Sequence, residues 1–214
     1  CFRHYVKERL CWMKLVIHVF HDHYTENMYA LVYLKNIDAE KRRELAAETA
    51  AKSDPLTRVY NRSSFEEEVS DFMTTGEDSA RGALLILDLD DFKQVNDRFG
   101  HLKGDEVLKS LAEVLRHTFR SHDLIGRLGG DEFLVFVKGI ENKEILDRRM
   151  DQLFSRLNDS CGDFLFCSAG ICFVSGEGFD YQKALKCADT ALYESKKKGK
   201  RRYSYYEKME DMKV

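Results

Sequence analysis

The chain has few of the features that mark membrane-spanning, disulfide-bonded or nucleic-acid-binding proteins. Its 214 residues include one proline and six cysteines, without a Cys-x-x-Cys pair. No apolar run approaches the ~18 residues that a membrane-spanning helix requires. The net charge of −3 provides no basic surface for a nucleic-acid polymer. We therefore expect a globular protein that does not bind nucleic-acid polymers.

The beginning of the chain and its cysteines suggest a fragment of a cytoplasmic protein. The sequence starts at Cys1 rather than Met and has no signal-peptide pattern, so we expect it to be part of a longer protein. Membrane attachment is then expected only through sequence upstream of Cys1. Several cysteines lie in apolar stretches such as 164–174, which favours reduced, buried thiols. A zinc site or a disulfide is the alternative.

Two apolar segments near the amino terminus predict a β-hairpin. Residues 12–20 and 28–36 are rich in β-branched and aromatic side chains, and a polar segment, 21–27, separates them. Two strands alone make no stable core, so they need partners. The end of this region, 34–44, resembles the last strand and exit helix of a PAS sensory domain. Residues 1–36 are accordingly interpreted as the C-terminal fragment of a PAS-like sensor, with a generic hairpin as the alternative.

The following segment predicts a helix that links two regions. Residues 38–53 are rich in Ala, Glu, Lys and Arg and contain no glycine or proline. We assign residues 37–53 as a linker helix. It is either a solvated connection or a signalling helix that pairs with its twin in a dimer.

From Asp54 onward the pattern alternates between helix and strand. The predicted elements are a helix capped by Ser63 or Ser64 and reaching Phe72, a strand at 83–89, a helix at 102–119, a hairpin at 124–137, a helix at 142–158, a strand at 164–174, a helix at 180–198 and a short strand near Tyr203. This order predicts an α+β, ferredoxin-like fold with a mostly antiparallel sheet and helices on one face. The domain is assigned to 54–207, and 208–214 form a tail.

The predicted topology brings distant carboxylates together. In a split β-α-β arrangement the third strand runs antiparallel beside the first. Asp88 ends the first strand, and Asp131 and Glu132 open the third. Clustered carboxylates repel one another unless a cation lies between them, and Mg²⁺ suits such hard oxygen ligands. For any one of these residues alone, an exposed strand end is the simpler interpretation.

Two further features lie close to these acids in the predicted fold. Gly129 and Gly130 form either a plain hairpin turn or a place where backbone approaches a nucleotide closely. The basic run 196–202 is either a solvated helix end or a triphosphate-binding segment, in which Lys196 and Lys200 hold the phosphates.

Four segments together resemble the GGDEF family of diguanylate cyclases. The signature is Gly129-Gly130-Asp131-Glu132-Phe133; residues 54–62 (DPLTRVYNR), 88–105 (DLDDFKQVNDRFGHLKGD) and 191–200 (ALYESKKKGK) resemble the family's opening, substrate and closing segments in the right order. The resemblance implies a nucleotidyl cyclase fold. It also implies that two GTP molecules are condensed into cyclic di-GMP by a homodimer that uses Mg²⁺ (or Mn²⁺).

The resemblance also assigns roles to individual positions. Asp88, Asp131 and the carbonyl of Leu89 would bind the metal; Glu132 would assist the attacking hydroxyl; Asn96 and Asp105 would bind guanine; Lys93, Lys196 and Lys200 would bind phosphates; Gly129 and Gly130 would shape the turn. Lys200 stands where many relatives have arginine, which loses the bidentate contact but keeps the charge.

A second site is implied just upstream of the signature. Arg120 and Asp123 stand at the place of the family's Arg-x-x-Asp inhibitory site, where a product dimer binds. A surface ion pair is the alternative. Two other functions remain open for the whole domain: a catalytically silent sensor of GTP or cyclic di-GMP, and a scaffold that passes on a sensor's signal.

Overall fold

The computed structural model describes residues 1–6, 9–21, 24, 26–75, 81–140, 142–161, 166–176 and 178–207. The chain divides into two units, Cys1–Ala51 and Lys52–Val214. The predicted tail at 208–214 lies outside the described residues. Among the helices that the structure describes, none combines the length and the apolar composition of a bilayer-crossing segment.

The first unit is a three-stranded antiparallel sheet followed by a helix. Its elements are β1 (Phe2–Val6), β2 (Arg9–His21), β3 (Met28–Asn36) and α1 (Asp38–Lys52), which continues to the start of the second unit. The predicted hairpin is confirmed as β2 and β3, while β1 was not predicted. Side chains along β2 and β3 remain exposed on both faces, among them Ile17 and Val19 on one face and Phe20 on the other.

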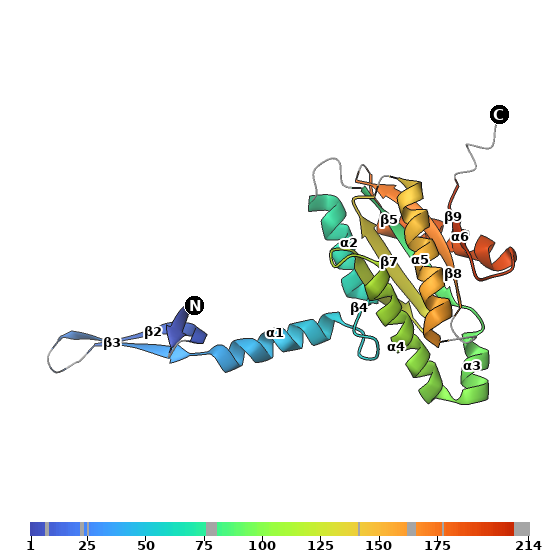
Figure 1. Ribbon diagram of the computed structural model, residues 1–214. Helices are drawn as coiled ribbons and strands as arrows, with labels where there is room; N and C mark the ends of the chain where they lie inside the picture. Colours follow the sequence, from blue (N-terminus) through green and yellow to red (C-terminus); the bar gives the residue numbers. More distant parts are fainter. Residues whose placement is uncertain are drawn as a thin grey trace. The chain divides into compact units, whose positions relative to one another are not determined.

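The second unit is built on a six-stranded mixed sheet (Figure 1). Its elements are β4 (Tyr60–Asn61), α2 (Arg62–Thr75), β5 (Arg81–Leu89), α3 (Phe92–Phe99), α4 (His101–Thr118), β6 (Leu124–Gly129), β7 (Glu132–Lys138), α5 (Lys143–Cys161), β8 (Cys167–Ser175), α6 (Tyr181–Lys197) and β9 (Tyr203–Tyr205). The strand order is β4-β6-β7-β5-β8-β9. The four central strands pair antiparallel, and β4 and β9 add parallel edges.

Helices cover both faces of this sheet, so the expectation of helices on one face was wrong. Leu85 and Leu87 of β5 pack in a cluster with α4 and α5. Leu84 and Ile86, which point to the opposite face, pack in a second cluster with α2 and α6. Helices on both faces explain why the sequence of β5 is apolar without interruption: both of its faces are buried, so neither carries polar side chains.

A local correction concerns the start of α2. The helix begins at Arg62, one residue before the predicted caps Ser63 and Ser64. The side chain of Asn61 accepts a hydrogen bond from the Ser64 N–H at 3.0 Å and serves as the cap.

Among the cysteines with described side chains, none forms a disulfide. Cys11, Cys167 and Cys172 are buried as expected, Cys187 is partly buried, and Cys1 is exposed, contrary to the expectation. Burial raises the pKa of the Cys167 thiol far above its ordinary value.

Candidate active site

The sheet brings the predicted carboxylates together. Asp88 at the end of β5 lies directly opposite Glu132, the first residue of β7. Asp131 lies in the preceding turn, and its carbonyl accepts a hydrogen bond from the Leu89 N–H at 3.3 Å. The antiparallel pairing of the first and third core strands, predicted from topology, is the cause of this arrangement.

A lysine from the last helix neutralises part of this cluster. The Lys196 ammonium lies 2.8 Å from the Asp88 carboxylate. Burial raises the pKa of Asp88 above its ordinary value, and the hydrogen bond from Lys196 opposes that rise. Burial likewise raises the pKa of Glu132, with a further contribution from the charges of Asp88 and Asp131. The carboxylates therefore favour a nearby cation.

The donor set fits a hard divalent metal ion. Asp88, Asp131 and the Leu89 carbonyl supply oxygen ligands, which Mg²⁺ prefers. The mutual repulsion of the carboxylates also favours a cation between them. In the geometry of the described residues, no three His, Cys, Asp or Glu side chains already form a metal-binding group.

The glycine turn is held by an arginine that the sequence analysis did not single out. Arg127 donates to the Gly130 carbonyl through Nε at 3.0 Å and through Nη2 at 2.6 Å. Its Nη1 lies 3.2 Å from Asp54, which ties the opening segment to the turn. Gly130 has a φ of 53°, in the left-handed region, and a Cβ there would meet nothing within 4 Å. The turn thus requires glycine for its backbone conformation while the space above it stays open.

Two aspartates beyond Asp88 fix the segment that leads into α3. Asp90 is buried and accepts hydrogen bonds from the Ser168 hydroxyl at 2.8 Å and from the Arg201 N–H at 3.0 Å. Asp91 forms an ion pair with Lys200 at 2.7 Å. Both partners of that pair have left-handed backbones, with φ of 59° and 62°. The segment after α6 is thereby held against the end of β5.

The predicted guanine-binding residues lie at the junction of α3 and α4. A Cβ on Gly104 would lie 2.0 Å from the Oδ1 of Asn96, so only glycine leaves room for that side chain. Asp105, the next residue, is half-buried, and Lys93 is exposed on α3. The sequence predicted Asn96 and Asp105 as site residues, but the requirement for glycine at position 104 is evident only from the close approach of the Asn96 side chain to its backbone.

The proposed inhibitory residues lie at the opposite end of β7 from Glu132. Asp123 is buried and accepts from the Lys138 N–H at 3.1 Å, from the Arg120 N–H at 2.9 Å and from Arg149 at 2.9 Å. Arg120 is exposed. The Asp123 carboxylate therefore bonds to protein groups in this structure, while the Arg120 side chain faces solvent.

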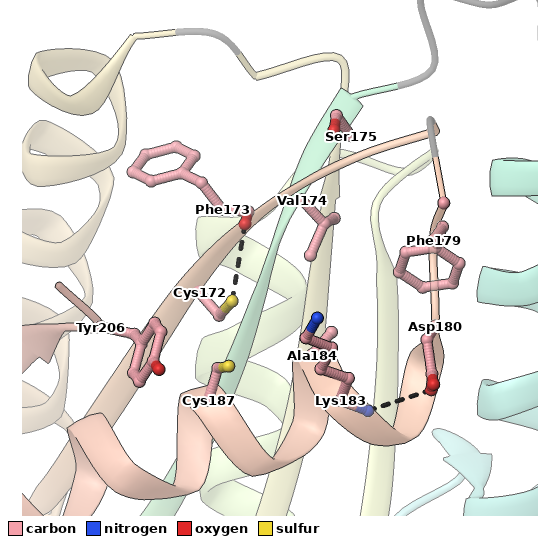
Figure 2. A pocket seen from close by; sticks show the side chains of 11 residues that line it. Cys172, Phe173, Val174, Ser175, Phe179, Asp180, Lys183, Ala184, Cys187 and Tyr206 are labelled. Carbon is pink, nitrogen blue, oxygen red and sulfur yellow. Dashed lines mark hydrogen bonds between the residues drawn. The ribbon is translucent and has the colours of Figure 1, made fainter. Parts of the chain in front are cut away.

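A separate hollow of about 250 Å³ lies between the end of β8 and the start of α6. Figure 2 shows Cys172 and Cys187 on its walls beside Tyr206, and Asp180 capping α6 through the Lys183 N–H at 3.1 Å. The carboxylate cluster lies at the other ends of the same strand and helix, since Asp88 pairs with Ser168 and contacts Lys196.

Comparison with known proteins decides the family. Residues 51–202 match the family described as "Diguanylate cyclase, GGDEF domain". The chain belongs to the GGDEF family. It is 35% identical over 169 residues to the probable diguanylate cyclase DgcC of Escherichia coli, covering 77% of this chain and 45% of that protein. It is 36% identical over 159 residues to the diguanylate cyclase DgcP of Pseudomonas aeruginosa, covering 71% of this chain and 23% of that protein.

A solved GGDEF domain shares the fold. The GGDEF domain of DgcB from Caulobacter crescentus, solved in complex with c-di-GMP, is 26% identical, with a TM-score of 0.67. The match covers 74% of this chain and 97% of that one. The chain spans less than half the length of the two curated relatives. These GGDEF proteins support the fold and the family of this chain.

Proposed function

We propose that this chain is a diguanylate cyclase that condenses two GTP molecules into cyclic di-GMP and releases two pyrophosphates. The observation that carries the proposal is the register pairing of Asp88 with Glu132 beside Asp131, with Lys196 2.8 Å from Asp88. A domain that only bound nucleotide would not need this full set of carboxylates.

Each group has a defined task in the proposed reaction. Asp88, Asp131 and the Leu89 carbonyl would hold Mg²⁺ (or Mn²⁺), which when bound neutralises charge on the phosphates. Lys196 and Lys200 bind phosphate oxygens, which requires them to leave Asp88 and Asp91. Asn96 and Asp105 bind the guanine edge, and their hydrogen bonds favour GTP over ATP. Lys93 supplies a further positive charge.

The chemical step is a displacement at phosphorus. The 3′-hydroxyl oxygen of one GTP forms a bond to the α-phosphorus of the other, and the bond from that phosphorus to the β-phosphate bridging oxygen breaks. Glu132 accepts the proton of the attacking hydroxyl, and pyrophosphate leaves. The same step repeated between the two joined nucleotides closes the ring. Positioning and charge neutralisation provide most of the acceleration.

The symmetry of the product favours a homodimer. Cyclic di-GMP has two-fold symmetry, so two domains that each hold one GTP and face each other are suited to make it. The expected consequence is that the rate per domain falls on dilution to monomer. Sedimentation combined with rate measurements tests this, and a rate per domain that stays constant in the monomer contradicts it.

We also propose a sensory role for the first unit and product inhibition for the second. The three-stranded sheet would belong to a PAS-like sensor, and α1 would be the linker helix through which that sensor sets how the two domains face each other, in the cytoplasm where GTP is available. Arg120 would bind a product dimer, because its side chain is exposed.

The deciding experiment is pyrophosphate release from GTP and Mg²⁺ at high protein concentration, with chromatography for cyclic di-GMP. Asp131→Ala serves as the blank. Product that disappears in the variant supports the proposal. Tight GTP binding by calorimetry with no product, in a protein shown to be dimeric, supports the silent-sensor alternative.

A further inference from the structure

A hollow beside the carboxylate cluster has no role in the reaction as described so far. It has a volume of about 320 Å³. Glu132 of β7 forms one wall, and the other lining residues belong to α6: Asp189, Thr190, Leu192, Tyr193 and Lys196. It therefore adjoins the place where the proposed attack occurs.

The hollow lies on the opposite face of the sheet from the guanine-binding residues. Helix α4, which carries Asp105, packs in the cluster of Leu85 and Leu87. Helix α6 packs in the cluster of Leu84 and Ile86. A GTP held through Asn96 and Asp105 would reach the carboxylates from the first face and bring only its phosphates to Lys196. The part of the hollow at Asp189 and Tyr193 therefore remains open to a different nucleotide.

The charges in the hollow suit a sugar better than a phosphate. Two of its lining groups are carboxylates, Glu132 and Asp189, and their charges are close enough to interact. Its lysine, Lys196, pairs with Asp88 in this structure and, in the proposed reaction, binds the phosphates of the GTP held at Asp88, so it is not available to a second phosphate group. Two carboxylates repel a phosphate group but accept hydrogen bonds from uncharged hydroxyl groups.

The outer wall is suited to the same ligand. Tyr193 is 58% exposed, so its ring borders the hollow without being covered by the fold. The Lys197 ammonium lies 4.3 Å from the ring centroid, a cation–π contact on the solvent side of the hollow. An exposed aromatic ring next to hydrogen-bond acceptors can pack against the apolar C–H face of a sugar, while the hydroxyl groups of the sugar donate to the carboxylates.

We propose that this hollow holds the ribose of the attacking GTP and that Asp189 accepts a hydrogen bond from its 2′-hydroxyl, which turns the 3′-hydroxyl toward Glu132. This inference rests on the proposed cyclase reaction and adds the subsite of the second substrate. Asp189 is exposed on α6, so its replacement leaves the folded core intact.

The test compares Asp189→Asn with the wild-type chain on GTP and on 2′-deoxy-GTP. We expect the variant to release pyrophosphate from GTP about tenfold more slowly, because the hydrogen bond from the 2′-hydroxyl is weakened when its acceptor loses the negative charge. On 2′-deoxy-GTP the two proteins should be equally active, because the partner of Asp189 is missing. Glu194→Gln, on the same helix and paired with Lys197 at 3.5 Å, is the matched control and should retain the wild-type preference.

Binding measurements separate the possible failures. Calorimetry with 3′-deoxy-GTP, which keeps the 2′-hydroxyl but cannot attack, should show weaker binding to Asp189→Asn than to wild type. Unchanged binding in the variant, an equal loss of rate on both nucleotides, or no loss on GTP would each overturn the inference while leaving the cyclase proposal standing. A wild-type chain that releases no pyrophosphate contradicts the proposed function, and this inference with it.

Discussion

Lys196 and Asp88 form an ion pair of 2.8 Å at the centre of the site, across the gap between α6 and the end of β5. The same aspartate is a proposed metal ligand and the same lysine a proposed phosphate ligand. In the absence of nucleotide the two side chains neutralise each other's charge. Binding of Mg²⁺ and GTP therefore replaces this ion pair with two new contacts, one between Asp88 and the metal and one between Lys196 and a phosphate.

Replacing Lys196 should therefore affect metal and nucleotide in opposite directions. Lys196→Met is expected to bind Mn²⁺ several-fold more tightly without nucleotide, because a competing positive charge is removed. It should bind GTP about tenfold more weakly, because a charge-assisted hydrogen bond to phosphate is lost. Metal titration and calorimetry measure both effects. Lys186→Met, an exposed lysine on the same helix, is the control, and tighter metal binding there too would contradict the explanation.

A second prediction concerns the contact between α6 and β8. A Cβ at Gly170 would lie 2.0 Å from the Ala188 carbonyl oxygen and 2.2 Å from the Leu192 nitrogen, both backbone atoms of α6. Gly170→Ala should lower the free energy of unfolding by about 3 kcal/mol. It should also slow the reaction, since the displaced helix carries Lys196. Urea denaturation and pyrophosphate release measure these effects.

The control for that change is Gly178→Ala. Gly178 has a φ of +64° but open space around it, so the substitution costs only backbone strain, about 1 kcal/mol. Equal destabilisation by the two substitutions would show that the close contact of α6 with β8 is not the cause.

A third prediction follows from the partly buried carboxylate of Asp54. Burial by itself would raise its pKa, but hydrogen bonds from Thr57 and the charge of Arg127 outweigh this and hold the pKa below its ordinary value of 3.8. Because the folded-state pKa is the lower one, the stabilisation is present above pH 3.8 and disappears as the pH falls through the folded-state pKa.

The variant Asp54→Asn tests this assignment. At about pH 7 it should lower the free energy of unfolding by about 1–2 kcal/mol, because the hydrogen bonds to a charged acceptor are weakened. In acid the difference from wild type should shrink. Denaturation curves across this pH range measure it, with the exposed Asp97→Asn as control. A difference that is independent of pH would show that the charge of Asp54 is not involved.

A fourth prediction separates the two residues of the proposed inhibitory site. Asp123→Ala should lower the free energy of unfolding by about 3 kcal/mol, because it leaves Arg149 and two backbone N–H groups without their acceptor. Arg120→Ala should change stability by only about 0.5 kcal/mol, as expected at an exposed position. If product inhibition operates, Arg120→Ala should weaken it without unfolding the domain. Stability measurements and rates at increasing cyclic di-GMP test both, and inhibition unchanged in Arg120→Ala would exclude that role.

The sequence correctly predicted those features of the site that depend only on which strands pair. Continuous apolar segments and the split β-α-β order were sufficient to place Asp88 opposite Glu132. The prediction that helices cover one face of the sheet was wrong, although the sequence of 83–89 contained the information needed. A strand whose residues are all apolar has both of its faces buried.

The supporting residues could not be predicted because they act across long sequence separations. Arg127 meets Asp54 from 73 positions away, and Ser168 meets Asp90 from 78. Such pairs are decided by the packing of whole elements, for which a local sequence pattern has no signal. The cap of α2 was missed for a different reason, since Asn61 and the two serines after it are all suitable capping residues.

The edges of the six-stranded sheet limit how two copies of the domain can meet. In the described part of the chain, β4 has two residues and β9 has three, so each edge offers few unpaired backbone groups. A short edge is a poor template for another strand, which protects the domain from joining sheet to sheet and from aggregating by that route. The paired domains proposed above would then associate through their side chains and not through a shared sheet.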